Sequence, residues 1–351
     1  MSYRNRKSTD THDRIDIVIT WVNGGDSDWL KKKNEYMGLA DQSSVDARSR
    51  RFRDWDNLVY LFRGISKYTP WVNHVYLVTP NQCPEWLNQD CEKVTLINQD
   101  DLFEDKSVLP TFNNCSIELL LHKIPGLSEQ FVYLNDDMFI LRKTSATDFF
   151  RDGLPCITAA FAPPVAEFTE DFKGVYGINV MNTRLVGRHF KKKDVFRKNW
   201  RKYLDPRNGR EIIKTLCCLP FYGLVGFNEM HTAYSYLKST FEEVWEVEGD
   251  QLREVSNSKF RGEFSVNHHA MRYWQMAKGD IAIRRRSFSK MFDLHHFREV
   301  RPVLDAINKG RPNMICINDN VEDEADFEPI CTAIKGAFQN RLPEKCEYEL
   351  Q

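Results

Sequence analysis

The stretch Phe131-Val-Tyr-Leu-Asn-Asp-Asp-Met-Phe139 joins an apolar run to two adjacent carboxylates. Its first four residues have the β-branched and aromatic content of a buried strand, which stops at Asn135, Asp136 and Asp137. Open α/β folds bind their ligands at the carboxyl ends of the strands, so this strand would present both carboxylates to a ligand. Because adjacent carboxylates repel each other, they need a cation, a shared proton or water. The competing interpretation is a strand followed by an Asp-rich turn.

The segments around this stretch alternate between strand-like and helix-like patterns. Before it, the sequence predicts strands at 15–20, 75–79 and 93–98 and helices at 28–40, 55–68 and 116–124. After it, we expect strands at 176–182 and 313–317 and helices at 232–247, 266–278 and 327–341. This order predicts an α/β fold: a Rossmann-like, GT-A-like, mainly parallel sheet with crossover helices and a helical subdomain.

The composition is that of an ordinary globular protein. The 351 residues are 42% hydrophobic and 28% charged, with a net charge of -1, so bulk charge does not indicate a nucleic-acid partner. We find no apolar run of about eighteen residues for a membrane span and no secretory signal, and we expect a cytoplasmic protein. The nine cysteines lack zinc-site or thioredoxin spacing, so reduced thiols are expected.

Two other segments have both a structural and a functional interpretation. The first predicted strand runs into Trp21-Val-Asn-Gly-Gly-Asp26, where glycine would allow the backbone to approach a ligand; Trp21 could stack on a nucleobase or pack in the core. Residues 188–202 carry eight Lys or Arg with interspersed aromatics. This basic segment could lie on the anionic inner face of a membrane, cradle an anionic polymer, or form a solvated helix with its aromatics packed inward.

Four blocks of sequence together resemble the Stealth family, the sugar-1-phosphate transferases that include bacterial capsule polymerases and a eukaryotic GlcNAc-1-phosphotransferase. The first block is Ile15-Asp-Ile-Val-Ile-Thr-Trp-Val-Asn-Gly24 with Asp26. The second begins at Arg51-Phe-Arg-Asp54, passes through Leu109-Pro-Thr-Phe-Asn113 and ends at Tyr133-Leu-Asn-Asp-Asp-Met-Phe139. The third is His231 with Lys238-Ser239 and Phe260-Arg261, and the fourth is Cys316-Ile-Asn-Asp319.

The resemblance implies an enzyme that moves a sugar-1-phosphate from a nucleotide sugar, such as UDP-GlcNAc, to a glycan hydroxyl and releases a nucleoside monophosphate. It implies Mg²⁺ or Mn²⁺ on Asp136 and Asp137, with Asp319 as a third ligand. Asp137 could instead orient or deprotonate the acceptor. His231 would be the general acid or base, because its ordinary pKa lies near neutrality, and Arg261 would stabilise the phosphate charge.

The resemblance also implies a binding site for the nucleotide sugar. Its residues would be Trp21, Asn23, Gly24, Asp26, Arg53, Asp54 and Asn113. Asn113 or Asn114 could alternatively cap the helix that follows. Where the family usually has Glu-Leu-Arg-Tyr, this chain has Asn57-Leu-Val-Tyr60, so no role is carried over to those two changed positions.

We expect one continuous catalytic unit, since the sequence contains no repeats or low-complexity linkers. Its predicted parts are a disordered lead-in (1–14), a nucleotide-sugar-binding α/β half (15–150), a remainder with the helical subdomain and a closing strand (151–320), and a C-terminal helix and tail (321–351). Two other functions are open: a glycosyltransferase that releases nucleoside diphosphate, and a non-catalytic protein that binds glycan or membrane.

Overall fold

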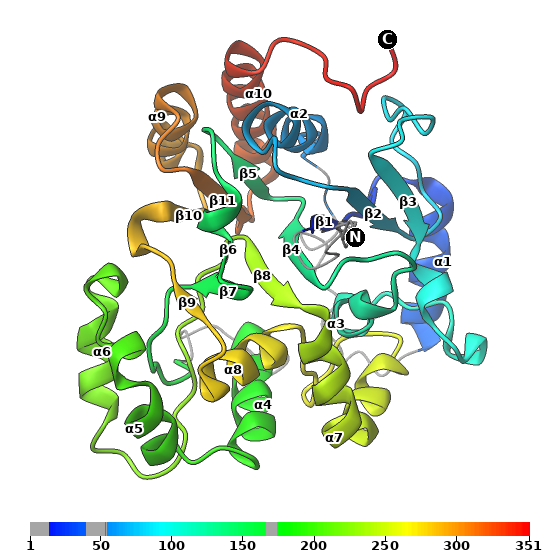
Figure 1. Cartoon of the computed structure of the whole chain (residues 1–351). Helices are drawn as coiled ribbons and strands as arrows, with labels where there is room; N and C mark the ends of the chain where they lie inside the picture. Colours follow the sequence, from blue (N-terminus) through cyan, green and yellow to red (C-terminus); the bar gives the residue numbers. More distant parts are fainter. Residues whose placement is uncertain (1–13, 40–52, 54, 166–173) are drawn as a thin grey trace, which may run out of the picture.

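A five-stranded sheet lies at the centre of the computed structural model, which describes residues 14–39, 53, 55–165 and 174–351 (Figure 1). The spatial order of its strands is β3-β2-β1-β4-β8, and all neighbours are parallel except β4 and β8. In chain order the strands are β1 (Ile15–Thr20), β2 (Val75–Thr79), β3 (Val94–Asn98), β4 (Gln130–Asn135) and β8 (Tyr234–Leu237). The predicted α/β class with a mainly parallel sheet is confirmed. The predicted lead-in lies almost wholly outside the described residues.

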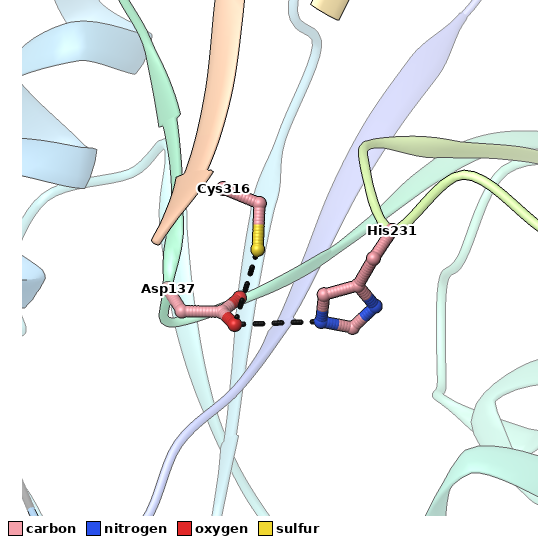
Figure 2. A group of neighbouring side chains, drawn as sticks. All are labelled: Asp137, His231 and Cys316. Atoms are coloured by element: carbon pink, nitrogen blue, oxygen red, sulfur yellow. Dashed lines mark hydrogen bonds and ion pairs between the residues drawn. The ribbon is translucent and has the colours of Figure 1, made fainter. Parts of the chain in front are cut away.

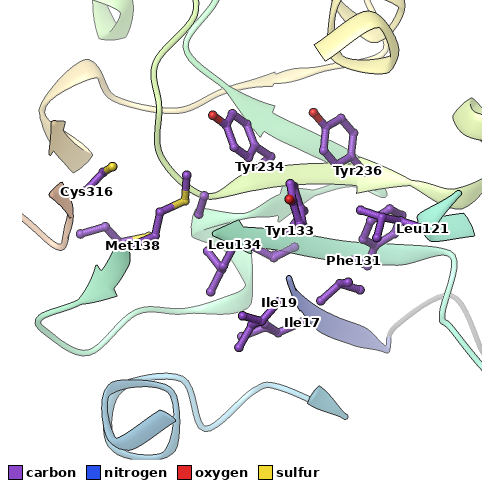
Figure 3. Close-up of a cluster of buried hydrophobic side chains, with 14 of the residues drawn as sticks. Ile17, Ile19, Leu121, Phe131, Tyr133, Leu134, Met138, Tyr234, Tyr236 and Cys316 are labelled. Atoms are coloured by element: carbon purple, nitrogen blue, oxygen red, sulfur yellow. The ribbon is translucent and has the colours of Figure 1, made fainter. Parts of the chain in front are cut away.

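The middle strands β1 and β4 form the core of the sheet, and most of their side chains are buried on both faces. Ile17 and Ile19 of β1 pack near Phe131 and Leu134 of β4, all with at most 1% of their surface exposed (Figure 3). Continuous apolar runs are typical of parallel strands covered on both faces, and this is why the sequence predicted these two strands well.

The register of the sheet brings distant segments to one edge. Thr20 pairs with Asn135, so the loop after β1 and the carboxylates after β4 leave the sheet side by side. Strand β8 runs antiparallel to β4, with Tyr234 opposite Tyr133, so the residues that precede β8 return to this same edge. Only this arrangement of strand ends assembles the candidate site.

Two three-stranded sheets extend the structure. In the first, β11 (Met314–Asp319) lies between β10 (Ser289–Leu294), which is parallel to it, and β5 (Met138–Ile140), which is antiparallel. Cys316 pairs with Met138, so Asn318-Asp319 at the end of β11 lies near Asp136 and Asp137, which follow β4. The second sheet is formed by β6 (Phe150–Arg151), β7 (Leu154–Ile157) and β9 (Ala282–Ile283).

Ten α-helices surround the sheets in the described part of the chain. They are α1 (Ser27–Leu39), α2 (Leu58–Tyr68), α3 (Asn114–Leu119), α4 (Val175–Gly187), α5 (Lys192–Tyr203), α6 (Glu211–Cys218), α7 (Lys238–Ser256), α8 (His269–Lys278), α9 (Arg301–Lys309) and α10 (Glu324–Arg341). Helices α4, α5, α6 and α8 gather on one side of the molecule, while α2, α9 and α10 lie on the opposite side (Figure 1). None of the described helices has the length and apolar content of a membrane span.

Two predicted elements are wrong. The strand predicted at 176–182 belongs to helix α4, whose buried Ile178, Met181 and Leu185 recur at helical spacing. The helix predicted from Thr232 begins only at Lys238, because Tyr234–Leu237 pair with β4 as strand β8. The predicted helix at 55–68 begins at Leu58, and that at 116–124 is α3 followed by a short 3₁₀ turn.

Candidate active site

Three side chains that come from separate segments of the chain meet beside β4 (Figure 2). Asp137 follows β4, His231 precedes β8, and Cys316 lies in β11. The Nε2 atom of His231 lies 3.4 Å from Asp137 Oδ2, and the Cys316 thiol donates a hydrogen bond of 3.2 Å to the same oxygen. The structure therefore brings together two of the three predicted catalytic residues.

The second ring nitrogen of His231 is also held. Its Nδ1 atom lies 2.8 Å from the hydroxyl of Tyr234, in β8. Its Nε2 atom lies 3.4 Å from Asn135 Nδ2, in addition to its contact with Asp137. Contacts at both nitrogens fix the orientation of the ring, as a proton-transfer group requires.

Opposing effects set the proton affinities in this cluster. Burial lowers the pKa of His231, but the Asp137 carboxylate outweighs burial and the net pKa is raised above its ordinary value. Burial, reinforced by Asp137, raises the pKa of Cys316 well above its usual range. The Cys316 thiol therefore stays protonated at neutral pH and serves as a hydrogen-bond donor to Asp137.

A hard divalent cation fits Asp137 better than it fits the cluster as a whole. The donor atoms of Asp137, His231 and Cys316 all lie within 4.8 Å of one another, a spacing that could hold a metal ion. Mg²⁺ and Mn²⁺ prefer oxygen ligands, however, and a protonated thiol is a poor one. Asp137 Oδ1 is buried without a hydrogen-bond partner among the described residues, so it has a lone pair left for a cation.

Arg261, the third predicted catalytic residue, lies in a buried polar network beside this cluster. Its Nη2 atom donates a hydrogen bond of 2.9 Å to Asn114 Oδ1, and the Asn114 amide donates to Glu118 Oε1 at 3.1 Å. Burial raises the pKa of Glu118, against the opposing effects of Arg261 and then of His269 and His231. Electrostatic interactions with Glu118 thus connect Arg261 and His231.

The loop after β1 is well ordered by its own polar groups. Asp26 accepts hydrogen bonds from the backbone N–H groups of Asp28 and Trp29 at the start of α1, each 3.0 Å long. These bonds, with that from Gln82, lower the pKa of Asp26. Asn23 also contacts Gln82, and Trp21, only 8% exposed, packs in the core. Gly24 lies between them at the same sheet edge as Asp137.

Arg53 and Asp319 pair with each other. Two guanidinium nitrogens of Arg53 donate to the two oxygens of Asp319, at 3.1 and 2.8 Å. Trp55 Nε1 adds a third hydrogen bond to this carboxylate. Asp319 is therefore neutralised by Arg53, although the family resemblance implies separate roles for the two residues in sugar and metal binding. Asp54 lies outside the described residues.

Asn113 is the N-terminal cap of helix α3, as one of its two interpretations from the sequence predicted. Its side-chain oxygen accepts a hydrogen bond from the backbone N–H of Cys115 and so caps α3. Its Nδ2 group is buried with no partner among the described residues, so the residue keeps a donor available. Asp136 lies in the turn between β4 and β5, partly exposed.

Sequence reasoning missed the supporting residues Tyr234 and Glu118 and gave no role to Cys316. Tyr234 was hidden inside a predicted helix, although the alternation of Tyr234 and Tyr236 is the spacing of a strand. Glu118 is a charged residue in an otherwise uncharged, mostly buried helix, and such a buried acid is a signal for a site.

Comparison with solved structures finds glycosyltransferases. Mouse xyloside xylosyltransferase 1 in its apo form gives a TM-score of 0.35 at 11% identity, covering 88% of this chain and 99% of that chain. Galactosyltransferase LgtC, in complex with donor and acceptor sugar analogs, gives 0.37 at 9% identity, covering 92% and 95%. TM-scores this low do not support an inference about the function of this chain.

Sequence comparison is far more specific. Residues 13–40 match Stealth protein CR1, conserved region 1, and residues 51–156 match Stealth protein CR2, conserved region 2. The capsular polysaccharide phosphotransferase WcwK of Streptococcus pneumoniae is 33% identical, covering 96% of this chain and 98% of the relative. The exopolysaccharide phosphotransferase cps2G of Lactiplantibacillus plantarum is 36% identical over 95% of this chain and 96% of its own length. The chain therefore belongs to the Stealth family.

Proposed function

We propose that the chain transfers a sugar-1-phosphate from a nucleotide sugar, such as a UDP-linked N-acetylhexosamine, to a hydroxyl group of a glycan acceptor during polysaccharide synthesis. The products are a phosphodiester and a nucleoside monophosphate. The observation that carries the proposal is the contact of His231 with Asp137 beside β4, in a chain whose relatives include polysaccharide phosphotransferases.

In this reaction His231 removes the proton of the attacking hydroxyl. When Nδ1 carries the ring proton and donates a hydrogen bond to the Tyr234 hydroxyl oxygen, Nε2 keeps a lone pair that can accept a proton. The Asp137 carboxylate, 3.4 Å away, then stabilises the imidazolium that forms. This is the arrangement of a general base supported by a carboxylate.

The negative charge of the diphosphate needs positive charge nearby. Arg261 supplies a guanidinium that is 7% exposed and whose Nε has no partner among the described residues. Asp136 and Asp137 would hold a divalent cation, since Mg²⁺ commonly takes one or two protein carboxylates together with substrate phosphates. Such a cation supplies further charge neutralisation at the phosphate groups. Asp319 would first have to leave Arg53 to act as a third ligand.

The released nucleotide decides between this reaction and glycosyl transfer. The purified protein is incubated with a panel of nucleotide sugars and a glycan acceptor, with and without excess EDTA, and the nucleotides are separated by chromatography. We expect nucleoside monophosphate, and its loss in EDTA. Nucleoside diphosphate as the product would contradict the proposal, while full activity in EDTA would contradict the cation.

We further propose that this enzyme works at the inner face of a membrane, which it contacts through residues 188–202. Support comes from helix α5, whose exposed side chains include Lys193, Lys198 and a Trp200 that is 47% exposed. Buried Lys192 donates to the carbonyl groups of Cys218 and Leu219 at the end of α6, next to exposed aromatic residues in the turn at 220–223. Cations with interspersed aromatics suit an anionic lipid surface.

Vesicle flotation tests this contact. The wild type should float with vesicles that contain phosphatidylglycerol and remain below with neutral phosphatidylcholine vesicles. The double variant Lys193→Glu/Lys198→Glu should lose flotation, whereas Lys31→Glu/Lys32→Glu on α1, with the same change in charge, should keep it. Equal flotation of both variants would rule out α5 as the contact.

A further inference from the structure

A basic pocket lies between the start of α6 and the start of β10, away from the residues discussed so far. Its volume is about 770 Å³. It is open to solvent and is bordered by the 3₁₀ turns at Pro206–Asn208 and Arg286–Phe288. Its lining contains the five cations Arg207, Arg210, Arg285, Arg286 and Lys290.

The charges of this pocket are only partly compensated. Arg207 pairs with Asp205, and the buried carboxylate of Glu211 is shared by Arg286 at 3.1 Å and by Lys214 at 2.8 Å, with Arg210 at 3.6 Å. Arg285 and Lys290 are exposed and make no ion pair with any described residue. The positive charges of Arg285 and Lys290 therefore remain in the lining of the pocket, where an anion could bind them.

The pocket is connected to the candidate active site by a pair of strands. Ser289, in its lining, begins β10 and pairs with Met314 of β11; two residues further along, Met291 pairs with Cys316, the thiol that contacts Asp137. At about 3.3 Å per residue, this step along the strand is about 7 Å. The pocket therefore lies on the same pair of strands that carries Cys316 of the candidate active site.

We propose that the basic pocket binds a phosphodiester group of the acceptor glycan. This inference rests on the proposed function, because that reaction leaves a phosphodiester in its glycan product, which an acceptor in a further round would carry. Guanidinium groups match phosphate oxygens in geometry as well as charge, and four of the five cations are arginines. A neutral glycan would gain nothing from this excess of positive charge, so the pocket selects acceptors that are already anionic.

The test is a binding measurement without any donor, so that it does not depend on catalysis. The probe is a fluorescent oligo(glycerol phosphate), a phosphodiester chain, compared with neutral maltohexaose and with phosphatidylglycerol vesicles. The pocket variant is Arg285→Glu/Lys290→Glu, and the matched control is Lys31→Glu/Lys32→Glu on α1. All four positions are exposed, and circular dichroism verifies that both variants fold.

We expect the wild type and the control to bind the phosphodiester oligomer and not maltohexaose, with an affinity that falls as salt rises. The pocket variant should bind it at least about tenfold more weakly, as the loss of two charge-assisted contacts implies. Equal affinity of pocket variant and control, or binding only to the lipid vesicles, would overturn the proposal. A failure of the proposed function would be visible separately, as the absence of nucleoside monophosphate in the wild-type reaction.

Discussion

Two carboxylates of this protein, the half-buried Asp137 and the buried Glu349, both face a basic side chain, yet their surroundings differ. Glu349, in the C-terminal tail, accepts two hydrogen bonds from Arg63 of α2, at 2.8 and 2.7 Å, and one from the backbone of Cys346. Asp137 has one oxygen that contacts His231 and Cys316 and one buried oxygen without a partner among the described residues.

The difference separates a structural ion pair from a carboxylate that keeps hydrogen-bonding capacity for a substrate or cation. Buried polar groups are nearly always hydrogen-bonded, so a buried oxygen without a partner among the described residues supports this role for Asp137. Other such atoms are Asn135 Oδ1, whose side chain contacts His231, and Glu118 Oε2 and Arg261 Nε in the polar network coupled to His231. Arg63 also donates hydrogen bonds to the carbonyl groups of Leu342 and Pro343, and so holds the C-terminal segment against α2.

The largest effect is expected at Asp137. Asp137→Asn keeps the size of the side chain but removes the charge that stabilises a protonated His231, and it weakens any cation site. Turnover should fall by about a thousandfold or more, within the range for general acid–base groups, while the melting temperature changes little. Steady-state kinetics and thermal unfolding measure both. A variant with near-normal turnover would contradict the assigned role, and His231→Gln should cause a loss of similar size.

The opposite outcome is expected at Glu349. Glu349→Ala leaves the Arg63 guanidinium, whose side chain is 14% exposed, without its partner. Breaking a buried ion pair in this way costs about 3 kcal/mol of unfolding free energy. Urea denaturation measures the loss, and turnover per folded molecule should be unchanged. A turnover loss as large as that of Asp137→Asn would remove the distinction between the two carboxylates.

A smaller effect on turnover is expected at Tyr234. Tyr234→Phe removes the hydroxyl that lies 2.8 Å from Nδ1 of His231 but keeps the ring in the core. Since the ring of His231 is then less well oriented, kcat should fall by about tenfold, with little change in KM. Tyr236→Phe is the matched control, because Tyr236 contacts His268 instead. Equal kcat values for the two variants would count against this positioning role.

The smallest effect concerns pH. Burial raises the pKa of Glu349, but the hydrogen bonds from Arg63 outweigh burial and lower the pKa below its ordinary value. The ionised group therefore contributes its full stability above the unfolded pKa, near pH 4.5, and loses it as the pH falls through the folded pKa. The unfolding free energy of Glu349→Gln should depend less on pH below about 4.5 than that of the wild type. If the unfolding free energies of the wild type and the variant changed with pH in parallel, the ion pair between Glu349 and Arg63 would be contradicted.

The sequence predicted the centre of the fold better than its margins. Strands β1 and β2 were predicted with their observed bounds and β4 nearly so, because uninterrupted apolar runs are typical of strands buried on both faces. Strand β5 was missed because three residues give no readable periodicity, and β8 because its register with β4 is a tertiary contact.

The candidate site was predicted in part. Asp137 and His231 were both singled out through the family motifs, and the structure brings them together, although His231 was expected before a helix and not before strand β8. The pairing of Arg53 with Asp319 was not foreseen, because the two residues are more than 260 positions apart and no local pattern connects them. The support from Tyr234 and Glu118 likewise depends on the packing of β8 and α3 against β4.

The most direct test of the central claim follows the β-phosphorus of the nucleotide sugar. The donor is synthesised with a radioactive β-phosphorus and incubated with the wild-type protein and a glycan acceptor, and glycan and nucleotides are then separated. Phosphoryl transfer with His231 as base predicts that the label enters the glycan in a phosphodiester, and that Asp137→Asn abolishes this incorporation. If the label remains in nucleoside diphosphate while the sugar enters the glycan, the protein is a glycosyltransferase and the account is wrong.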